Sequence, residues 1–486
     1  MNVGLALLLT GAILAASVVV ALGATRTGLP ALVAFLGFGM LLGSEGIGGI
    51  AFDDAPLARE VGVVGLAAIL YEGGLSTSWR RLRQVAVPAV LLATVGVVVT
   101  ALLAGAAAYT LFDLSLLEAV LLGAVVASTD AAAVFATLRH THIRRRVART
   151  LEAESGGNDP MAIALTLGLI AWIDNDHSGF GELVVLVVRQ IGLGLVVGIV
   201  LGAAATYVFS RFPESIGSFA PVASVASAAL AFGCADVIGG SGFLAVYLVG
   251  LAVGSTPSRH RRQLVAFHEG VAFLAQVALF IVLGLLVFPS RLSDVALPAL
   301  ALTALLIFVV RPVAVWLSTA RFADFTRRER VLIGWAGLRG AVPIVLATFV
   351  LSSHVAPAQT IFNTVFFVVL VSTILQGTTL EWVAGRLGLR SAAVAVPEAP
   401  LEVGSAWAQL ELVDFAVAHD HAVAGARVRE LGLPRDALIA VIARGDDAIP
   451  PRGSTQVSAG DRLFVLVPRA KRPDLEDVFS RWRRRI

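Results

Sequence analysis

Asn158 and Asp159 are adjacent polar residues in an apolar stretch, residues 151–166, whose pattern predicts a helix. Ser155 lies one turn earlier, so the three side chains share one helical stripe. If this helix crosses a bilayer, an ionised carboxylate there costs about 2.5–3.5 kcal/mol. Oxygen ligands beside a titratable group can hold a small cation or a proton, and competition between the two would couple their movements. The alternative is a structural polar cluster.

Another apolar stretch, residues 116–138, contains Thr129 and Asp130. The Thr129 carbonyl and the Asp130 carboxylate would suit a hard cation; alternatively, Asp130 only caps the ends of half-helices. Residues 337–348 repeat the pattern with Arg339 as the charge. The two stretches lie seven predicted spans apart, an odd offset that inverts the topology. Broken helices in inverted repeats mark the substrate site of secondary transporters, where Asp130 and Arg339 would neutralise freed helix ends.

Other charged residues also fall at membrane depth. Glu154 needs a partner there, and we predict a structural ion pair with Arg311, with Arg339 as the competing partner. Glu72 lies near the cytoplasmic end of its predicted span and is either an entrance ligand for the cation or an interfacial acid. His268 is expected at a membrane interface.

The composition indicates a membrane protein. Of 486 residues, 57% are hydrophobic and 15% are charged, whereas a soluble domain carries about 25% charged residues. Mean hydropathy is +0.85. The arginines cluster in short loops, which indicates topology signals rather than a nucleic-acid surface. The sequence has no glycine-rich phosphate loop, no paired histidine spacing and a single cysteine, Cys234, so we expect neither an enzyme nor a cofactor.

The apolar stretches predict thirteen transmembrane helices, the first of which is a retained span. Loops after odd-numbered spans carry seventeen arginines, whereas loops after even-numbered spans carry only Arg59 and Arg291. The positive-inside rule then places the N-terminus outside and the C-terminus in the cytoplasm. The predicted spans are 3–23, 29–48, 60–76, 84–112, 116–138, 148–173, 182–210, 217–236, 240–254, 264–290, 293–320, 328–351 and 360–384.

The sequence changes character near residue 397, where the long apolar stretches end. Alternating apolar residues predict strands at 411–417, 438–444 and 461–467, and therefore a small cytoplasmic α+β domain. The basic end of the chain is either an amphipathic helix on anionic lipid or a solvated tail. The predicted organisation is a transmembrane domain at 1–390, a linker at 391–404, the α+β domain at 405–467 and a basic tail at 468–486.

Three motifs, at residues 128–130, 154–159 and 337–343, resemble the bacterial sodium/proton exchanger family (monovalent cation:proton antiporter-1), and most closely its potassium/proton antiporter branch. The resemblance covers about residues 5–385. It implies a dimerisation domain beside a mobile core in which two broken helices cross.

The resemblance also implies roles for individual residues. Asp159 matches the acid that binds both the cation and the proton, and Asn158 matches the residue that distinguishes electroneutral members. Glu154 and Arg311 match the ion pair of the family. The groups that match ligands around the ion are Asp130, the Thr129 carbonyl, Ser155 and Glu72. Residues 405–467 resemble the TrkA C-terminal ligand-binding domain, for which a nucleotide is a plausible ligand by analogy.

These observations predict a homodimeric secondary antiporter in a bacterial inner membrane. It would exchange cytoplasmic K⁺ or Na⁺ for H⁺, one for one, by an elevator movement that the C-terminal domain regulates. The C-terminal domain favours K⁺ over Na⁺ only weakly. The alternative is a ligand-gated cation channel or K⁺ efflux pathway, against which stands the absence of a Thr-Val-Gly-Tyr-Gly pore loop.

Overall fold

A computed structural model describes most of the chain as two compact units, Met1–Ala395 and Val396–Ile486. Each unit has its own hydrophobic core. The structure describes residues 2–483, except 28–29, 131–133, 135–142, 176–178, 212–216, 218, 257–259, 323, 391–409, 445–446 and 469–470.

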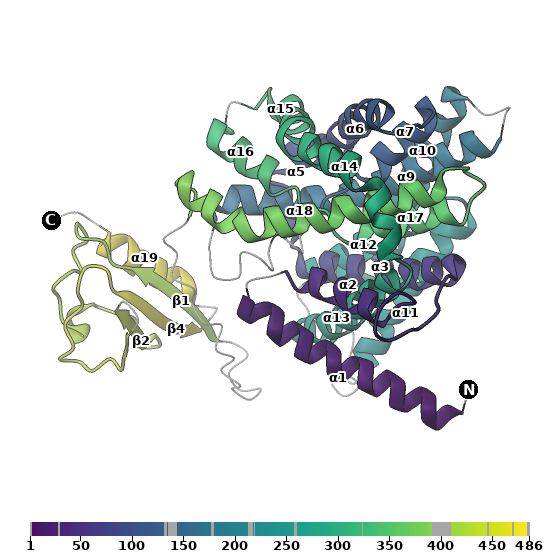
Figure 1. Ribbon diagram of the computed structural model, residues 1–486. Helices are drawn as coiled ribbons and strands as arrows, with labels where there is room; N and C mark the ends of the chain where they lie inside the picture. Colours follow the sequence, from purple (N-terminus) through teal and green to yellow (C-terminus); the bar gives the residue numbers. More distant parts are fainter. Residues whose placement is uncertain are drawn as a thin grey trace. The chain divides into compact units, whose positions relative to one another are not determined.

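The described part of the first unit is helical, as the sequence predicts for a multi-pass membrane protein (Figure 1). Among the residues that the structure describes, seven helical segments are long and apolar enough to cross a membrane. The count of thirteen spans stays a prediction. The seven are α1 (Val3–Thr27), α5–η1–α6 (Ala86–Leu111), α10 (Phe180–Arg211), α11 (Ala220–Val237), α13 (Arg261–Leu285), α14–η3–α15 (Pro289–Thr319) and α18 (Ala358–Arg386). The other helices are α2 (Ala31–Leu42), α3 (Ala55–Ser76), α4 (Trp79–Leu82), α7 (Leu116–Val125), α9 (Arg145–Asp174), α12 (Gly242–Ser255), α16 (Arg327–Trp335) and α17 (Ala341–Leu351).

The outermost helices expose apolar side chains instead of burying them. Helix α1 lies along the edge of the unit against α2 (Figure 1). Its residues Leu7 and Val19 are largely exposed. Helices α10 and α11 likewise carry exposed leucine, valine and phenylalanine side chains. In water such a surface would promote aggregation, whereas lipid tails are as apolar as these side chains. The pattern therefore fits a bilayer as the solvent.

Helices α3 and α12 pack closely because glycines remove the side chains between them. A Cβ atom on Gly250 of α12 would overlap the backbone of Tyr71 in α3, and a Cβ on Gly74 of α3 would overlap the backbone of Tyr247 in α12. Small residues at a helix interface let two backbones approach in this way. The packing fixes Tyr247 next to the C-terminal end of α3.

Two helices are interrupted, and their interruptions meet. Helix α7 ends at Val125 and residues 126–130 are not helical, whereas residues 336–340 separate α16 from α17. The backbone N–H of Asp130 donates to the carbonyl oxygen of Leu338 at 2.9 Å. Gly340 is required at this crossing, because a Cβ atom there would overlap the Asp130 carboxylate. The predicted break beside Arg339 is thus confirmed. The chain also leaves the helix before Asp130, although most of the second half of that predicted span lies outside the described residues.

The second unit is a four-stranded antiparallel sheet with a helix on one face. Its strand order is β1-β4-β2-β3, with a register shift in β2 between Ile439 and Val441. Alternate residues of the strands, such as Phe415, Leu463 and Val465, form a buried cluster. The strands are β1 (Leu410–Ala416), β2 (Leu438–Arg444), β3 (Asp447–Ile449) and β4 (Arg462–Pro468), with a 3₁₀ turn η5 (Val428–Glu430) and helix α19 (Arg472–Trp482).

Helix α19 corrects the prediction for the C-terminal tail. We expected residues 468–486 to form a lipid-bound helix or a solvated end. Instead, Leu475, Val478, Phe479 and Trp482 are buried in the core of the second unit, and the Trp482 indole N–H donates to the Leu431 carbonyl at 2.8 Å. Apolar residues spaced three and four apart form one helix face, and this face covers the sheet. The domain therefore extends to Trp482, beyond the predicted boundary at 467.

Candidate cation and proton site

Asp159 lies inside the first unit on α9, with only 5% of the residue exposed. The Ser128 hydroxyl, from the non-helical segment after α7, donates to Asp159 Oδ1 at 2.8 Å. The Asp130 carboxylate is close enough to interact electrostatically with Asp159. Among the described residues no arginine or lysine forms an ion pair with Asp159. A buried carboxylate without a fixed countercharge is neutralised by a proton or by a mobile cation.

Asn158 and Thr129 connect the same two segments. The Asn158 side-chain N–H donates to the Thr129 hydroxyl at 2.6 Å, and both residues are buried. The Asn158 Oδ1 atom has no hydrogen-bond partner among the described residues. Ser155 is half-buried one turn before Asp159 on α9. Predicted residues from two distant parts of the sequence therefore meet around Asp159. Most of them offer oxygen atoms that can act as ligands for a cation.

Arg339 holds the interrupted segments together. Its guanidinium Nη1 donates to the carbonyl oxygens of Ala127 at 2.7 Å and Ser128 at 2.6 Å, just beyond the C-terminal end of α7. A cation there compensates the partial negative charge of the helix end. Asp130 in turn lies against Gly340, the residue before α17, where a helix N-terminus carries partial positive charge. The two charges are placed as the sequence predicts for neutralising freed helix ends.

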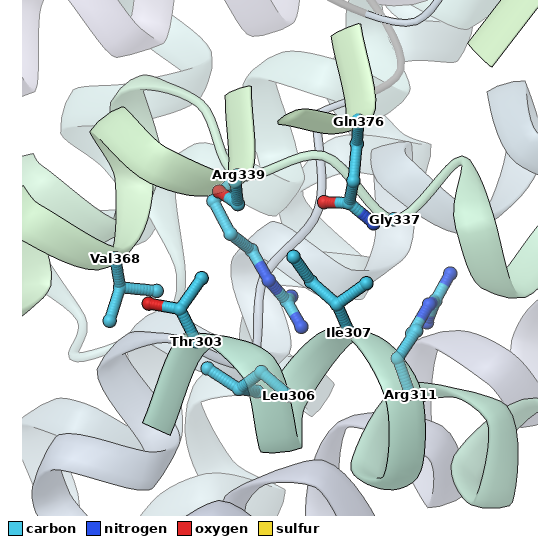
Figure 2. Close-up of a pocket in the computed structure, with 9 residues that line it drawn as sticks. Thr303, Leu306, Ile307, Arg311, Gly337, Arg339, Val368 and Gln376 are labelled. Carbon is cyan, nitrogen blue, oxygen red and sulfur yellow. The ribbon is translucent and has the colours of Figure 1, made fainter. Parts of the chain in front are cut away.

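Glu154 and Arg311 form a buried ion pair between α9 and α15. The Arg311 Nη1 and Glu154 Oε1 atoms are 2.6 Å apart, in a charge contact that is not aligned as a hydrogen bond. The side chains are 3% and 1% exposed, respectively. Arg339, the competing candidate, lies in the same small pocket but is engaged by backbone carbonyls. Figure 2 shows Arg339 and Arg311 on opposite sides of Ile307, with Gln376 near Gly337.

Glu72 and His268 are placed differently from the Asp159 group. The Ser76 hydroxyl donates to Glu72 Oε1 at 2.6 Å within α3, and Glu72 interacts electrostatically with Glu269. The described contacts of Glu72 are thus with Ser76 and Glu269, and its role as an entrance ligand stays a prediction. His268 is buried in the protein, and its Nε2 atom lies 2.9 Å from the Ser224 hydroxyl. Its expected position at a membrane interface stays a prediction.

Sequence reasoning missed two groups. Ser128 stands directly before the predicted pair of Thr129 and Asp130, and the structure makes it the hydrogen-bond donor to Asp159. Ser128 is part of the motif at residues 128–130, but a non-helical segment has no periodicity that would select one of three neighbouring residues. The second group comprises Glu152 and Thr77, whose side chains hydrogen bond at 2.7 Å near Tyr247.

The ligand chemistry of the cluster is that of an alkali-metal cation or a proton. Carboxylate, hydroxyl and amide oxygens are hard ligands. In the described part of the chain, no group of three or more histidine, cysteine, aspartate or glutamate side chains is arranged for a metal ion. The site thus offers one buried titratable group with neutral oxygen donors around it, and a second carboxylate, Asp130, at its edge.

Comparison with known proteins defines the class. Residues 13–386 match the family described as sodium/hydrogen exchanger, transmembrane, and the chain belongs to this family. Residues 412–480 match the TrkA-C domain, a range that includes most of α19.

Particular relatives are also similar over most of their length. The chain is 38% identical to a K(+)/H(+) antiporter NhaP2 of Shewanella baltica (strain OS223), over 97% of this chain and 82% of that protein. It is 36% identical to the K(+)/H(+) antiporter NhaP of Alkalimonas amylolytica, over 98% and 84%. Among solved structures, it resembles the sodium proton antiporter MjNhaP1 of Methanocaldococcus jannaschii, determined at pH 8. That match has a TM-score of 0.70 at 25% identity and covers 80% of this chain and 99% of the other.

Proposed function

We propose that this protein is a secondary antiporter that exchanges a monovalent cation for H⁺ at Asp159. The observation that carries the proposal is the buried Asp159 carboxylate, which accepts a hydrogen bond from Ser128 and has no arginine or lysine ion-pair partner in the described structure. In a medium of low dielectric, such a group needs a neutralising positive charge. A proton and an alkali-metal cation both meet this need, and one excludes the other.

Competition at a single carboxylate gives exchange without coupling between two separate sites. If the site becomes accessible from the other side of the membrane only when the charge of Asp159 is neutralised, a cation moves in one direction and a proton moves in the other. Asn158 carries no charge, and its side chain is held by a hydrogen bond to Thr129. Of the adjacent residues Asn158 and Asp159, only Asp159 can therefore change its charge state. We therefore assign a one-for-one, electroneutral exchange.

The cation we assign is K⁺. The two relatives named above that align with nearly the whole chain are both K(+)/H(+) antiporters. A more distant relative, the Na(+)/H(+) antiporter ApNhaP of Aphanothece halophytica, is 30% identical over 67% of this chain and 64% of that protein. Similarity supports K⁺ over Na⁺, with Na⁺ as the alternative that the transport assay must compare.

The remaining elements of the proposal concern the assembly and the cell. The excess of arginines after odd-numbered predicted spans supports a C-terminus in the cytoplasm. The bacterial membrane antiporters that resemble the chain support a location in a bacterial inner membrane. We further propose a homodimer embedded in lipid, an elevator movement of the mobile core that contains the crossed breaks past the dimerisation domain, and regulation by a small molecule, such as a nucleotide, at the C-terminal domain.

Everted membrane vesicles with a pH-sensitive dye test the function. Adding K⁺ to vesicles with an established ΔpH should dissipate the gradient in wild type, whether or not the membrane potential is clamped. Asp159→Asn should abolish the response, because the amide cannot exchange a proton, and Asp113→Asn, at an exposed position, should leave it intact. Comparing K⁺, Na⁺ and Li⁺ identifies the preferred ion. A response that follows membrane potential and ignores ΔpH would instead indicate a channel.

A further inference from the structure

Tyr247 presents a buried hydroxyl with no assigned role. The residue is 7% exposed, and its Oη atom makes no well-aligned hydrogen bond among the described residues, although the Thr77 side chain is close enough to interact with it. Its ring, on α12, lies directly over Gly156 of α9, so that a Cβ atom at residue 156 would overlap the ring. A phenolic hydroxyl usually finds a partner when it is buried. The Tyr247 hydroxyl, which lies against α9, therefore has capacity for a further ligand.

The surroundings of this hydroxyl are rich in oxygen. The Thr77 hydroxyl lies beside Tyr247, and it hydrogen bonds Glu152 Oε1 at 2.7 Å and the Gly73 carbonyl at 2.8 Å. The charges of Glu152 and Asp159 both act on the Tyr247 hydroxyl. Thr77 also follows the last residue of α3, where carbonyl groups give a helix its partial negative charge.

The geometry of α9 places Tyr247 between two carboxylates. Glu152, Gly156 and Asp159 lie on one stripe of the helix, and the two acids are separated by seven residues, or about 10 Å along the axis at 1.5 Å per residue. Pro160 has no N–H for the Gly156 carbonyl, the acceptor four residues earlier. A hydroxyl and a backbone oxygen therefore lie midway between Glu152 and Asp159. The stripe runs from Asp159 toward the arginine-rich N-terminal end of α9.

We propose that Glu152, Thr77 and Tyr247 form a second station for the same monovalent cation, on the arginine-rich side of Asp159. This inference rests on the proposed function and adds a binding step to it. Glu152 is only half-buried, so it takes the cation from the aqueous side, and the Tyr247 hydroxyl provides an oxygen ligand on the way to Asp159. The competing explanation is structural, with the bond between Thr77 and Glu152 simply fastening α3 to α9.

Kinetics separate the two explanations. Glu152→Gln and Tyr247→Phe keep the shape of each side chain, with exposed Glu182→Gln and Tyr109→Phe as matched controls. Loss of a charged ligand should raise the K⁺ concentration for half-maximal exchange by about tenfold in Glu152→Gln and by a few-fold in Tyr247→Phe. The maximal rate should stay within about twofold, since Asp159 is intact. If both variants match their controls, the station does not exist.

A binding measurement tests the station without transport. Radioactive Rb⁺ is titrated onto purified, monodisperse Asp159→Asn protein and onto the Asp159→Asn, Glu152→Gln double variant. Residual binding in the first that disappears in the second supports the station, and equal binding in both overturns it. Failure of the proposed function looks different, because wild-type vesicles would then show no cation-dependent change in ΔpH.

Discussion

Two carboxylates on α9, only five residues apart, are neutralised in opposite ways. Glu154 is paired with a permanent cation, Arg311, in a buried contact of 2.6 Å. Asp159 is also buried, yet its described hydrogen bond comes from a neutral hydroxyl. A fixed partner suits Glu154 to the structural role that we predict for it, whereas we propose that Asp159 stays available to a transported ion. In this account, the partner and not the acid separates a structural role from transport.

The largest effect is expected on breaking the fixed pair. Arg311→Gln leaves Glu154 buried without its cation, and removing one member of a buried pair typically costs about 3–5 kcal/mol of stability. The thermal unfolding temperature of the purified protein should fall strongly, with Arg327→Gln, at an exposed position, as the control. The double variant Glu154→Gln, Arg311→Gln should recover part of the loss. Equal stability of Arg311→Gln and wild type would show that the pair is not structural.

A smaller effect is expected at Asp159. Ser128→Ala removes the hydroxyl that donates to Asp159, and a hydrogen bond to a charged group is worth about 1.5–3 kcal/mol. The K⁺ concentration for half-maximal exchange should therefore rise at least about tenfold, while thermal stability changes less than in Arg311→Gln. Ser115→Ala, which removes a helix cap on α7, is a stability control that should leave the half-maximal K⁺ concentration unchanged. Unaltered K⁺ dependence in Ser128→Ala would separate Ser128 from the ion.

The smallest effect concerns a pair outside the membrane, between Arg444 and Asp461 of the second unit. Burial raises the pKa of Asp461, but hydrogen bonds from Arg444 and the Ser458 backbone outweigh it and hold that pKa below its usual value. A lowered pKa in the folded state stabilises the domain above the unfolded pKa of 3.8, and the stabilisation is lost as pH falls through the folded pKa.

Asp461→Asn should remove this pH dependence. Hydrogen-exchange mass spectrometry of the whole protein reports on strands β2 and β4. At neutral pH the variant should exchange faster there than wild type, and the difference should shrink as pH falls below about 4, the usual aspartate range. A wild-type domain whose protection does not change with acidification would contradict the account of this pair.

The sequence predicted most of the site because its signals are local. A charge in an apolar helix, as at Asp159, Glu154 or Arg311, is visible without knowledge of packing, and helical periodicity identifies which neighbours share its face. The break beside Arg339 could be predicted from its glycines. Ser128 could not, because residues 126–130 are not helical, and which side chain points at Asp159 depends on the crossing with residues 336–340.

Contacts between helices could not be predicted from the sequence either, because they too depend on how distant segments pack. Tyr247 reaches α9 only because glycines let α12 approach α3, and no pattern within α12 indicates this partner. The C-terminal tail shows the opposite error. Its arginines suggested lipid or solvent, although Leu475, Val478 and Trp482 already marked an apolar face. Which element covers such a face depends on tertiary packing. Here the sheet of the same domain covers it.

Proton release on cation binding tests the central claim most directly. Purified protein in weakly buffered detergent solution, near the pH at which half of the wild-type exchange activity remains, is mixed with K⁺ while a pH dye records the solution. If Asp159 holds either ion but not both, wild type should release up to about one proton per chain, and Asp159→Asn should release none. Release that persists undiminished in Asp159→Asn, or K⁺ binding without any proton release in wild type, would contradict the account.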